Sequence, residues 1–308
     1  MKKLNLVFGV LFSLLLGSVP LMAADALMVT DVGTSAGMLG KGQVEGFDSS
    51  AISVLENPAG LYRVKNQSVS MFSTQLMNEV DFRNVAYARK TKHGTFAIGY
   101  MGSLIDGIPE TATQNIGGQE KFVVNSYFNA ENMVVKAGFQ KTLKEELHVG
   151  FNMNYYSNSI GSVSGTGVNF DVGMVYQVSS LETSVVLKNV VPSMRANYSN
   201  GVEETYPFQT LWGVKYGRDY LDLMAQIKTT TAIDRNLLSL GATYRPVFLP
   251  FMHLNLGMKQ YMHLEDVNNH YTFGIGLTLF GLNFDYAYEK SEHLQFDNNN
   301  YFSLNFDF

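Results

Sequence analysis

"YFSLNFDF", residues 301–308, closes the chain with a strict alternation of apolar and polar side chains. Large apolar residues stand at every second position: Phe302, Leu304, Phe306 and Phe308. The positions between them are polar: Ser303, Asn305 and Asp307. Successive side chains of a strand point to opposite faces. The stretch therefore predicts a β-strand with one apolar and one polar face.

The same period of two recurs through the chain, in "LHVGFNMNY" (147–155), "VNFDVGMVY" (168–176), "YTFGIGLTL" (271–279) and "LNFDYAYE" (282–289). A soluble β-sandwich also alternates, so the composition of the second face has to decide. Gly, Asn, Thr, Ser, Asp, Lys and His line that face, while the first face is almost continuously apolar. In a membrane barrel the apolar face meets lipid and the polar face meets a lumen. The pattern favours a transmembrane antiparallel β-barrel over a secreted sandwich.

Fourteen strands are predicted, an even number as in single-chain bacterial barrels. Their ranges are 67–77, 82–90, 95–104, 128–142, 146–160, 165–178, 181–190, 207–217, 219–229, 236–246, 251–262, 271–279, 281–291 and 299–308. Most connections are short, whereas 105–127 and 191–206 are expected to be long polar loops. Short periplasmic turns and longer extracellular loops are typical of such barrels, so we expect both ends of the barrel chain on the periplasmic side.

The N-terminus has the three zones of a secretory signal peptide. "MKK" is basic, "LNLVFGVLFSLLLGSV" (4–19) is apolar, and "PLMAADA" (20–26) supplies small residues for cleavage. The apolar run is short for a membrane anchor and small residues follow it, which favours removal. We therefore expect residues 1–24 to be a signal peptide, 25–66 to be a plug segment and 67–308 to be an outer-membrane barrel.

Composition excludes several kinds of site. The chain of 308 residues has no cysteine, so disulfides, cysteine-bound zinc and iron–sulfur centres are absent. A net charge of -5 with 16% charged residues gives no footprint for nucleic acid. "LGKG" (39–42) fails the phosphate-loop motif, because Ser35 stands where the first Gly is needed and Gly42 where Ser or Thr is needed. No cofactor is expected.

Catalytic and metal sites are not expected either. An outer-membrane hydrolase needs Ser, His and Asp or Asn to converge near one barrel rim, and the six histidines are dispersed. His263 and His270 flank a predicted loop with Glu265 and Asp266 between them, but a solvated loop is the simpler interpretation than a metal site.

The segment before the first strand carries a family resemblance. "VGTSAGMLGKGQVEGFDSSAISVLENPAGLY" (32–62) resembles the N-terminal signature of the PorV/PorQ family and of the wider FadL-like outer-membrane barrels. The motif residues match position by position: Asn57, Pro58, Ala59, Gly60 and Leu61. "VGFNMNYYSNSI" (149–160), "LKNV" (187–190) and the final "FSLNFDF" (302–308) follow in the family's order. Lys41, where the family has a small residue, and Glu56 depart from it.

The resemblance implies a barrel whose N-terminal segment folds into its periplasmic end, with Asn57 to Leu61 holding it there. It also implies passive transport of hydrophobic or small solutes, with a hydrophobic small molecule or detergent as ligand. The alternative is a PorV-like barrel that does not transport but binds or anchors secreted proteins. Both place the chain in outer-membrane lipid, and the C-terminal Phe306 and Phe308 are expected to be read by the barrel-assembly machinery.

A hydrophobic path needs apolar side chains on the lumen face. The candidates on that face are scattered: Met101, Val175, Val186, Leu211 and Met224. The charged residues predicted to point inward have mixed signs: Lys136, Asp171, Lys188, Lys215, Asp222, Lys228, Arg245, Lys259, Asp285 and Glu289. Mixed signs predict pairing with one another or with the plug rather than selection of one ion. A plugged barrel is expected rather than an open porin.

Overall fold

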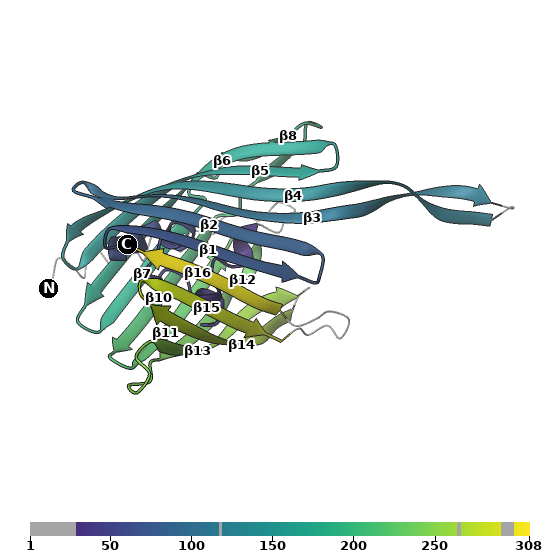
Figure 1. The fold of residues 1–308 in the computed structure, drawn as a ribbon. Coiled ribbons are helices and arrows are strands. Elements are labelled where there is room, and N and C mark those ends of the chain that lie inside the picture. Colours follow the sequence, from purple (N-terminus) through teal and green to yellow (C-terminus); the bar gives the residue numbers. More distant parts are fainter. Residues whose placement is uncertain (1–28, 117–118, 264–265, 291–298) are drawn as a thin grey trace.

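The computed structural model describes residues 29–116, 119–263, 266–290 and 299–308 (Figure 1). The predicted signal peptide lies outside the described residues. The strands of the described part are β1 (Gln67–Leu76), β2 (Val80–Thr91), β3 (Gly94–Ile116), β4 (Gln119–Lys144), β5 (Leu147–Ile160), β6 (Val163–Val178), β7 (Leu181–Lys188), β8 (Arg195–Tyr198), β9 (Glu203–Thr205), β10 (Gln209–Arg218), β11 (Leu221–Thr230), β12 (Ile233–Tyr244), β13 (Met252–His263), β14 (Asp266–Leu279), β15 (Leu282–Glu289) and β16 (Asn299–Asp307).

Fourteen of these sixteen described strands form a closed antiparallel barrel. Each pairs with its neighbour in the chain, except that β7 pairs with β10, and β1 with β16. The pairing of β5 with β6 completes the ring. The two remaining strands, β8 and β9, form a hairpin on β6. The predicted barrel of fourteen strands is confirmed.

The two faces of the strands are also as predicted. In β16 the side chains of Phe302, Leu304 and Phe306 are exposed on the outside of the barrel, whereas Ser303 and Asn305 are buried inside it. The same alternation of burial runs along β5 and β7. The outer surface is therefore an apolar belt, as lipid contact requires.

Three predicted loops are wrong. Residues 105–127 are not a loop but the extensions of β3 and β4, which are 23 and 26 residues long and pair with each other as far as Ile116 and Gln119. Figure 1 shows this hairpin reaching far beyond the other strands. We call residues 106–128 the arm, and the barrel end that carries it the arm end. Residues 191–206 contain β8 and β9, and β14 begins at Asp266 rather than at 271.

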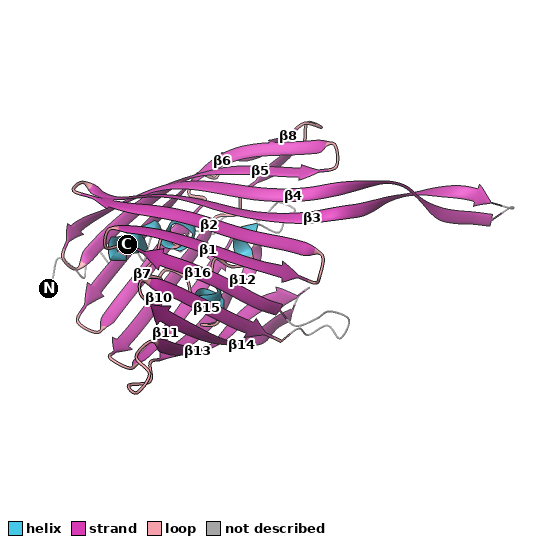
Figure 2. Cartoon of the chain, viewed as in Figure 1, coloured by secondary structure: helices cyan, strands magenta, loops and turns pink. Residues whose placement is uncertain are grey.

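In the part of the chain that the structure describes, four short helices lie inside the ring of strands, drawn in cyan in Figure 2: η1 (Val29–Asp31), α2 (Ala36–Leu39), α3 (Ser53–Glu56) and η2 (Pro58–Arg63). Among the described residues, no helix is long and apolar enough to cross a membrane. The helices belong to residues 29–66, which we call the plug. Its last residues lead into β1, where Gln67 and Phe308 exchange backbone hydrogen bonds. We call this end of the barrel the terminal end.

Candidate functional site

The Asn-Pro-Ala-Gly motif of the plug is bound to the wall at β6 and β7. Pro58 stands at the first position of η2, and Asn57 caps this helix by accepting a hydrogen bond from the Ala59 amide at 3.0 Å. The Asn57 Nδ2 donates to the Ser184 hydroxyl at 2.8 Å and to the Val185 carbonyl at 3.2 Å. The side chain therefore caps a plug helix and bonds the wall at once.

Two pairs of glycines let the plug backbone lie directly on the wall. Gly150 of β5 and Gly173 of β6 are direct partners, and a Cβ on either would collide with Asn57, Pro58 or Ala59. On β12 and β13, Gly241 and Gly257 are likewise partners, and a Cβ there would collide with the backbone of Lys41 or Gly42. We call these pairs the two glycine cradles.

The cradles were not recognised in the sequence, although a signal exists. Each glycine occupies a lumen-facing position of an alternating strand, as in "VGF" (149–151) and "DVGM" (171–174). Which of these glycines face one another across two strands is decided by the register alone. The cradles also explain both motifs of the plug, because "NPAG" rests on one cradle and "LGKG" on the other.

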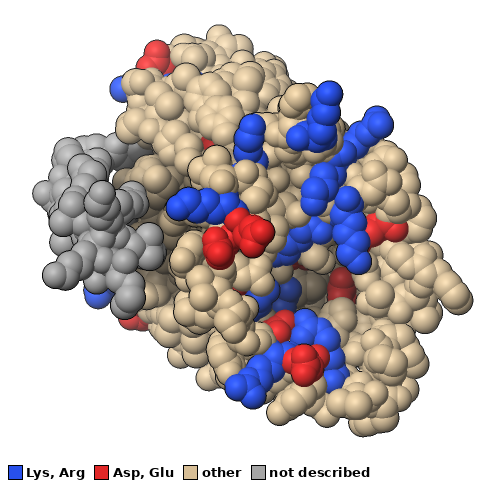
Figure 3. All heavy atoms as spheres, turned by 90° about the vertical axis from the view of Figure 1, so that its left-hand side faces the viewer, with Lys and Arg blue, Asp and Glu red and all other residues tan. Residues whose placement is uncertain are grey.

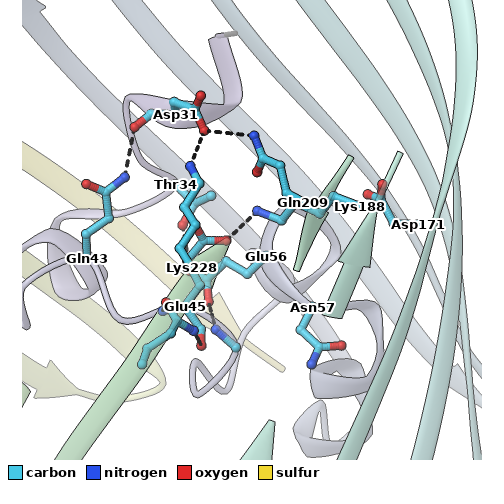
Figure 4. Close-up of polar contacts among 12 residues, drawn as sticks. Asp31, Thr34, Gln43, Glu45, Glu56, Asn57, Asp171, Lys188, Gln209 and Lys228 are labelled. Carbon is cyan, nitrogen blue, oxygen red and sulfur yellow. Dashed lines mark hydrogen bonds and ion pairs between the residues drawn. The ribbon is translucent and has the colours of Figure 1, made fainter. Parts of the chain in front are cut away.

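Ion pairs join the plug to one side of the barrel. Lys228 of β11 meets Asp31 at 2.5 Å, and Lys188 of β7 meets Glu45 at 2.5 Å. Figure 4 shows Asp31 between Lys228 and Gln209 of β10. At the terminal end Arg63 of the plug pairs with Glu182 of β7. All of these wall residues belong to β7, β10 and β11.

The predicted pairing of the inward charges is confirmed. Besides the pairs with the plug, the wall contains pairs that join neighbouring or nearby strands: Lys136–Asp171, Lys215–Glu182, Arg245–Asp222, His253–Asp285 and Lys259–Glu289. Lys136 and Asp171 are fully buried at 2.7 Å. Buried charges need such partners, since an unpaired ion is costly away from water.

Apolar contacts join the plug to the other side of the barrel. The wall residues of this buried cluster are Phe72, Phe82, Ala86, Ala88, Ala97, Met101, Val134, Tyr156, Ala196, Tyr206, Ala287 and Tyr301. They come from β1 to β5, β15, β16, β8 and the segment after β9. The plug contributes Leu39, Ile52 and Leu55, among others. Tyr206 covers the cluster from the β8–β9 hairpin side, stacking on Tyr156 at 4.4 Å. We call these wall residues the apolar inner wall.

The five apolar lumen candidates are all buried, but they do not form one site. Met101 belongs to the apolar inner wall. Met224 packs in a separate small cluster with Val44 and Phe47 of the plug. The remaining three, Val175, Val186 and Leu211, are buried outside both clusters. Most of the apolar inner wall, Phe72, Phe82 and Tyr156 included, was therefore missed.

A polar cavity of about 330 Å³ lies between the plug and β10 to β16 towards the terminal end. Plug residues Lys41 and Asp48 line it together with Arg245, His253 and Asn305 of the wall. The side chain of Lys41, which departs from the family signature, thus faces this cavity while its backbone rests on Gly241. Such a lining holds water rather than an apolar solute.

The residues that an enzyme or a metal site would use are engaged in other contacts. His253 bonds Asp285 at 2.9 Å and His148 bonds Thr142 at 2.9 Å, and in the described residues neither imidazole hydrogen-bonds a serine hydroxyl. His270 lies in β14 and bonds Glu289 at 2.5 Å. Glu265 lies outside the described residues, and within them no three His, Asp or Glu side chains are grouped to hold a metal.

Burial shifts the pKa values of the charged plug residues in different directions. Burial raises the pKa of Glu56 to about 7, and the charge of Asp48 adds to this effect. For Asp31 burial acts in the same direction, but the ammonium of Lys228 outweighs it and lowers the pKa. Burial lowers the pKa of Arg63. Glu56 is therefore a plug carboxyl that changes charge near neutral pH.

Comparison with known proteins identifies the fold. No family model matches the sequence, and a search of curated proteins finds no match. Among solved structures, the toluene transporter TodX of P. putida superposes with a TM-score of 0.60 at 12% identity, covering 90% of this chain and 99% of TodX. A FadL homologue of Pseudomonas aeruginosa superposes with a TM-score of 0.60 at 10% identity, covering 94% and 100%. The chain therefore has the fold of the FadL-like outer-membrane β-barrels.

Proposed function

We propose that this protein is an outer-membrane barrel through which hydrophobic small molecules pass without an energy source. The observation that supports this most directly is the division of the plug's contacts. Ion pairs and a hydrogen bond to Asp31 hold the plug on β7, β10 and β11. On the side of the apolar inner wall it is held by apolar contacts and by uncharged hydrogen bonds to Ser68, Asn84, Asn152 and Ser303. An apolar solute that enters between plug and wall on this second side breaks no ion pair and replaces one set of van der Waals contacts by another at the apolar residues. On the first side it would leave charges unpaired.

The solved structures support the same proposal by their fold. TodX is described as a toluene transporter and as a monoaromatic hydrocarbon channel. We therefore use toluene as the probe, and infer that the path runs from the arm end along Tyr206 and the apolar inner wall. Passage needs a displacement of the plug on its apolar side, while the ion pairs keep it attached. The polar cavity then supplies water at the exit.

The test compares two buried apolar residues that lie on different sides of the lumen. Met101 belongs to the apolar inner wall and Leu211 does not, although both are buried. Met101→Gln is expected to lower toluene entry into vesicles by about tenfold, because an amide on an apolar path must give up its hydration. Leu211→Gln is the control and should leave the rate close to wild type. Equal rates for the two variants would contradict the proposed path.

The plug can be tested by removing it. We propose that Asn57 to Leu61 tie the plug into the lumen, so deletion of residues 30–62 should raise the single-channel conductance in a planar bilayer. The barrel closes through β1 pairing with β16, and the pairings of its ring are made between wall strands. Unchanged conductance would mean that the plug does not obstruct the lumen in the membrane.

A second candidate function, binding of a secreted protein, is favoured by the arm. In the register of the arm, Glu110 pairs with Ser126 and Thr111 pairs with Val124, so Asn125 is an extra residue that forms a bulge. This bulge places Tyr127 on the same face of the arm as Phe122 and Val124. All three apolar side chains are exposed, Phe122 by 83%. Shortening the arm separates the functions, because transport should persist while attachment of a secreted protein would be lost.

A further inference from the structure

Six exposed cations lie together at the terminal end of the barrel. They lie at the last residues of β2 and β4, in the β2–β3 turn and in the residue pair before β1: Lys65, Arg89, Lys90, Lys92, Lys141 and Lys144. We call these residues the basic rim. Figure 3 looks onto this end and shows more Lys and Arg than Asp and Glu side chains on it.

The register shows that the basic rim is continuous. The Lys90 amide donates to the Asn66 carbonyl at 2.8 Å, which joins the end of the plug to β2. Arg89 pairs with Gln67 on one side and with Phe96 on the other. Thr95 pairs with Gln140, so the β2–β3 turn lies beside Lys141. The six cations therefore share one side of the rim.

The charge of the basic rim is not neutralised locally. In the described part of the chain, none of its six cations forms an ion pair. Three carboxylates lie among these cations, Glu145 and Glu146 in the β4–β5 turn and Asp307 near Lys65, so six positive and three negative charges leave an excess of three. The whole chain has a net charge of -5. The excess is thus a local property that composition does not explain.

The opposite side of the same rim is built differently. Arg245 pairs with Asp222 at 2.5 Å, and Asp219 follows directly after Arg218, so positive and negative charges balance there. That side also exposes large apolar residues, Val247 and Phe248 on the β12–β13 loop and Phe280 on the β14–β15 turn. Positive charge is therefore concentrated on one side only.

The basic rim borders the apolar belt of the barrel. Arg89 follows Tyr87 on the outer face of β2, and Lys141 follows Phe139 on the outer face of β4. The rings of Phe96 and Phe139 lie 4.7 Å apart between them. Aromatic rings at the edge of a belt mark the membrane interface, where the long side chains of Lys and Arg extend towards headgroups.

We propose that the basic rim binds the anionic phosphate headgroups of phospholipids in the leaflet at the terminal end of the barrel. This rests on the membrane location in the proposed function. Charge complementarity favours this occupant, because clustered Lys and Arg next to a membrane-embedded surface attract acidic lipids. Continuity with the lipid-facing belt favours a lipid over a soluble acidic protein. The site holds one side of the barrel against the headgroups, while Val247, Phe248 and Phe280 contact apolar parts of the same leaflet.

The experiment measures lipid selection by the full chain. Wild type, K90Q/K92Q/K141Q and R83Q/K121Q/R195Q are inserted into vesicles of equal phosphatidylglycerol and phosphatidylcholine, extracted in mild detergent, and analysed by native mass spectrometry. The third protein is the matched control, since it loses three exposed cations at the arm end. We expect wild type and control to retain phosphatidylglycerol over phosphatidylcholine by roughly tenfold, and the rim variant to lose this preference. Added salt should weaken the preference.

Two outcomes overturn the proposal, and they differ from failure of the proposed function. If the rim variant and wild type prefer phosphatidylglycerol equally, the basic rim does not bind lipid headgroups and its cations serve another partner, such as an acidic soluble protein. Equal loss in both variants would show that total charge, not the rim, selects the lipid. Insertion and toluene entry are measured in vesicles of phosphatidylcholine alone, where all three proteins should behave alike. Absence of insertion or entry there in wild type overturns the proposed function as well.

Discussion

Glu56 is a buried carboxyl that links three parts of the plug. It accepts hydrogen bonds from the Thr34 hydroxyl at 2.6 Å and the Gly46 amide at 2.7 Å. Because burial raises its pKa from 4.5 to about 7, the folded protein favours the neutral acid. The resulting contribution to stability is complete below about pH 4.5 and is lost as the pH rises through about 7.

Glu56→Gln should remove this dependence on pH. Between about pH 5 and about pH 8.5, wild type should lose about 2.5 kcal/mol of unfolding free energy that the variant keeps, by the linkage of pKa to stability. The measurement is urea unfolding of the vesicle-inserted protein at both pH values. The exposed Glu79→Gln is the control and should lose stability as wild type does. Parallel curves for Glu56→Gln and wild type would assign the dependence to another group.

Neighbouring residues of β16 test the assignment of its faces. Leu304 lies on the outer belt and Asn305 lies inside, beside the polar cavity. Leu304→Arg should cost about 2–4 kcal/mol, because a charge on the lipid face is penalised near the middle of the membrane. Asn305→Arg should cost much less, since its guanidinium reaches water in the cavity. Denaturant titration after refolding into vesicles compares the unfolding free energies of the two variants. A larger loss of unfolding free energy from Asn305→Arg would show that the two faces have been assigned the wrong way round.

At the scale of elements, the plug is held by its backbone as much as by its side chains. The first glycine cradle receives Pro58 and Ala59, so a side chain at Gly150 has no room. Gly150→Ala should therefore displace the plug at a cost of about 1–3 kcal/mol, the usual range for an overpacked site.

Trypsin detects this displacement through cleavage after Lys41 or Arg63, which should be faster in Gly150→Ala than in wild type. Gly217→Ala is the control, because a Cβ there meets only the flexible side chain of Asp222. Equal protection of both plug sites in the two variants would show that the cradle tolerates a methyl group.

The position of the arm predicts how the whole barrel is oriented in the membrane. Membrane-spanning strands need about 9–11 residues, so most of the arm lies outside the bilayer and extends roughly 35 Å beyond the barrel. Trypsin added to intact cells should therefore cleave after Lys121 of the arm but not after Lys92 or Lys144 of the short turns. Permeabilised cells are the control, in which all three sites are open to trypsin. Cleavage at Lys92 alone in intact cells would show that the barrel has the opposite orientation in the membrane.

The barrel and the direction of its side chains could be predicted from local patterns of residues. Alternation in 147–155 or 301–308 depends only on neighbouring residues of one strand, so the apolar outer face and the polar lumen could be predicted without knowing any partner strand. The place of the plug motif before the first strand could also be predicted. The terminal aromatic residues Phe306 and Phe308 lie on the outer belt, and their role in assembly stays a prediction.

The contacts between distant segments could not be predicted in this way. The arm escaped prediction because Gly107 and Pro109 interrupt any alternation there, and its strands exist by pairing with each other beyond the barrel. The β8–β9 hairpin likewise depends on β6. Asn57 packs against Gly173, and Lys41 packs against Gly241. Both contacts depend on the register of the fourteen strands in the closed barrel. Contacts of this kind follow from ring closure, which no local pattern of side chains encodes.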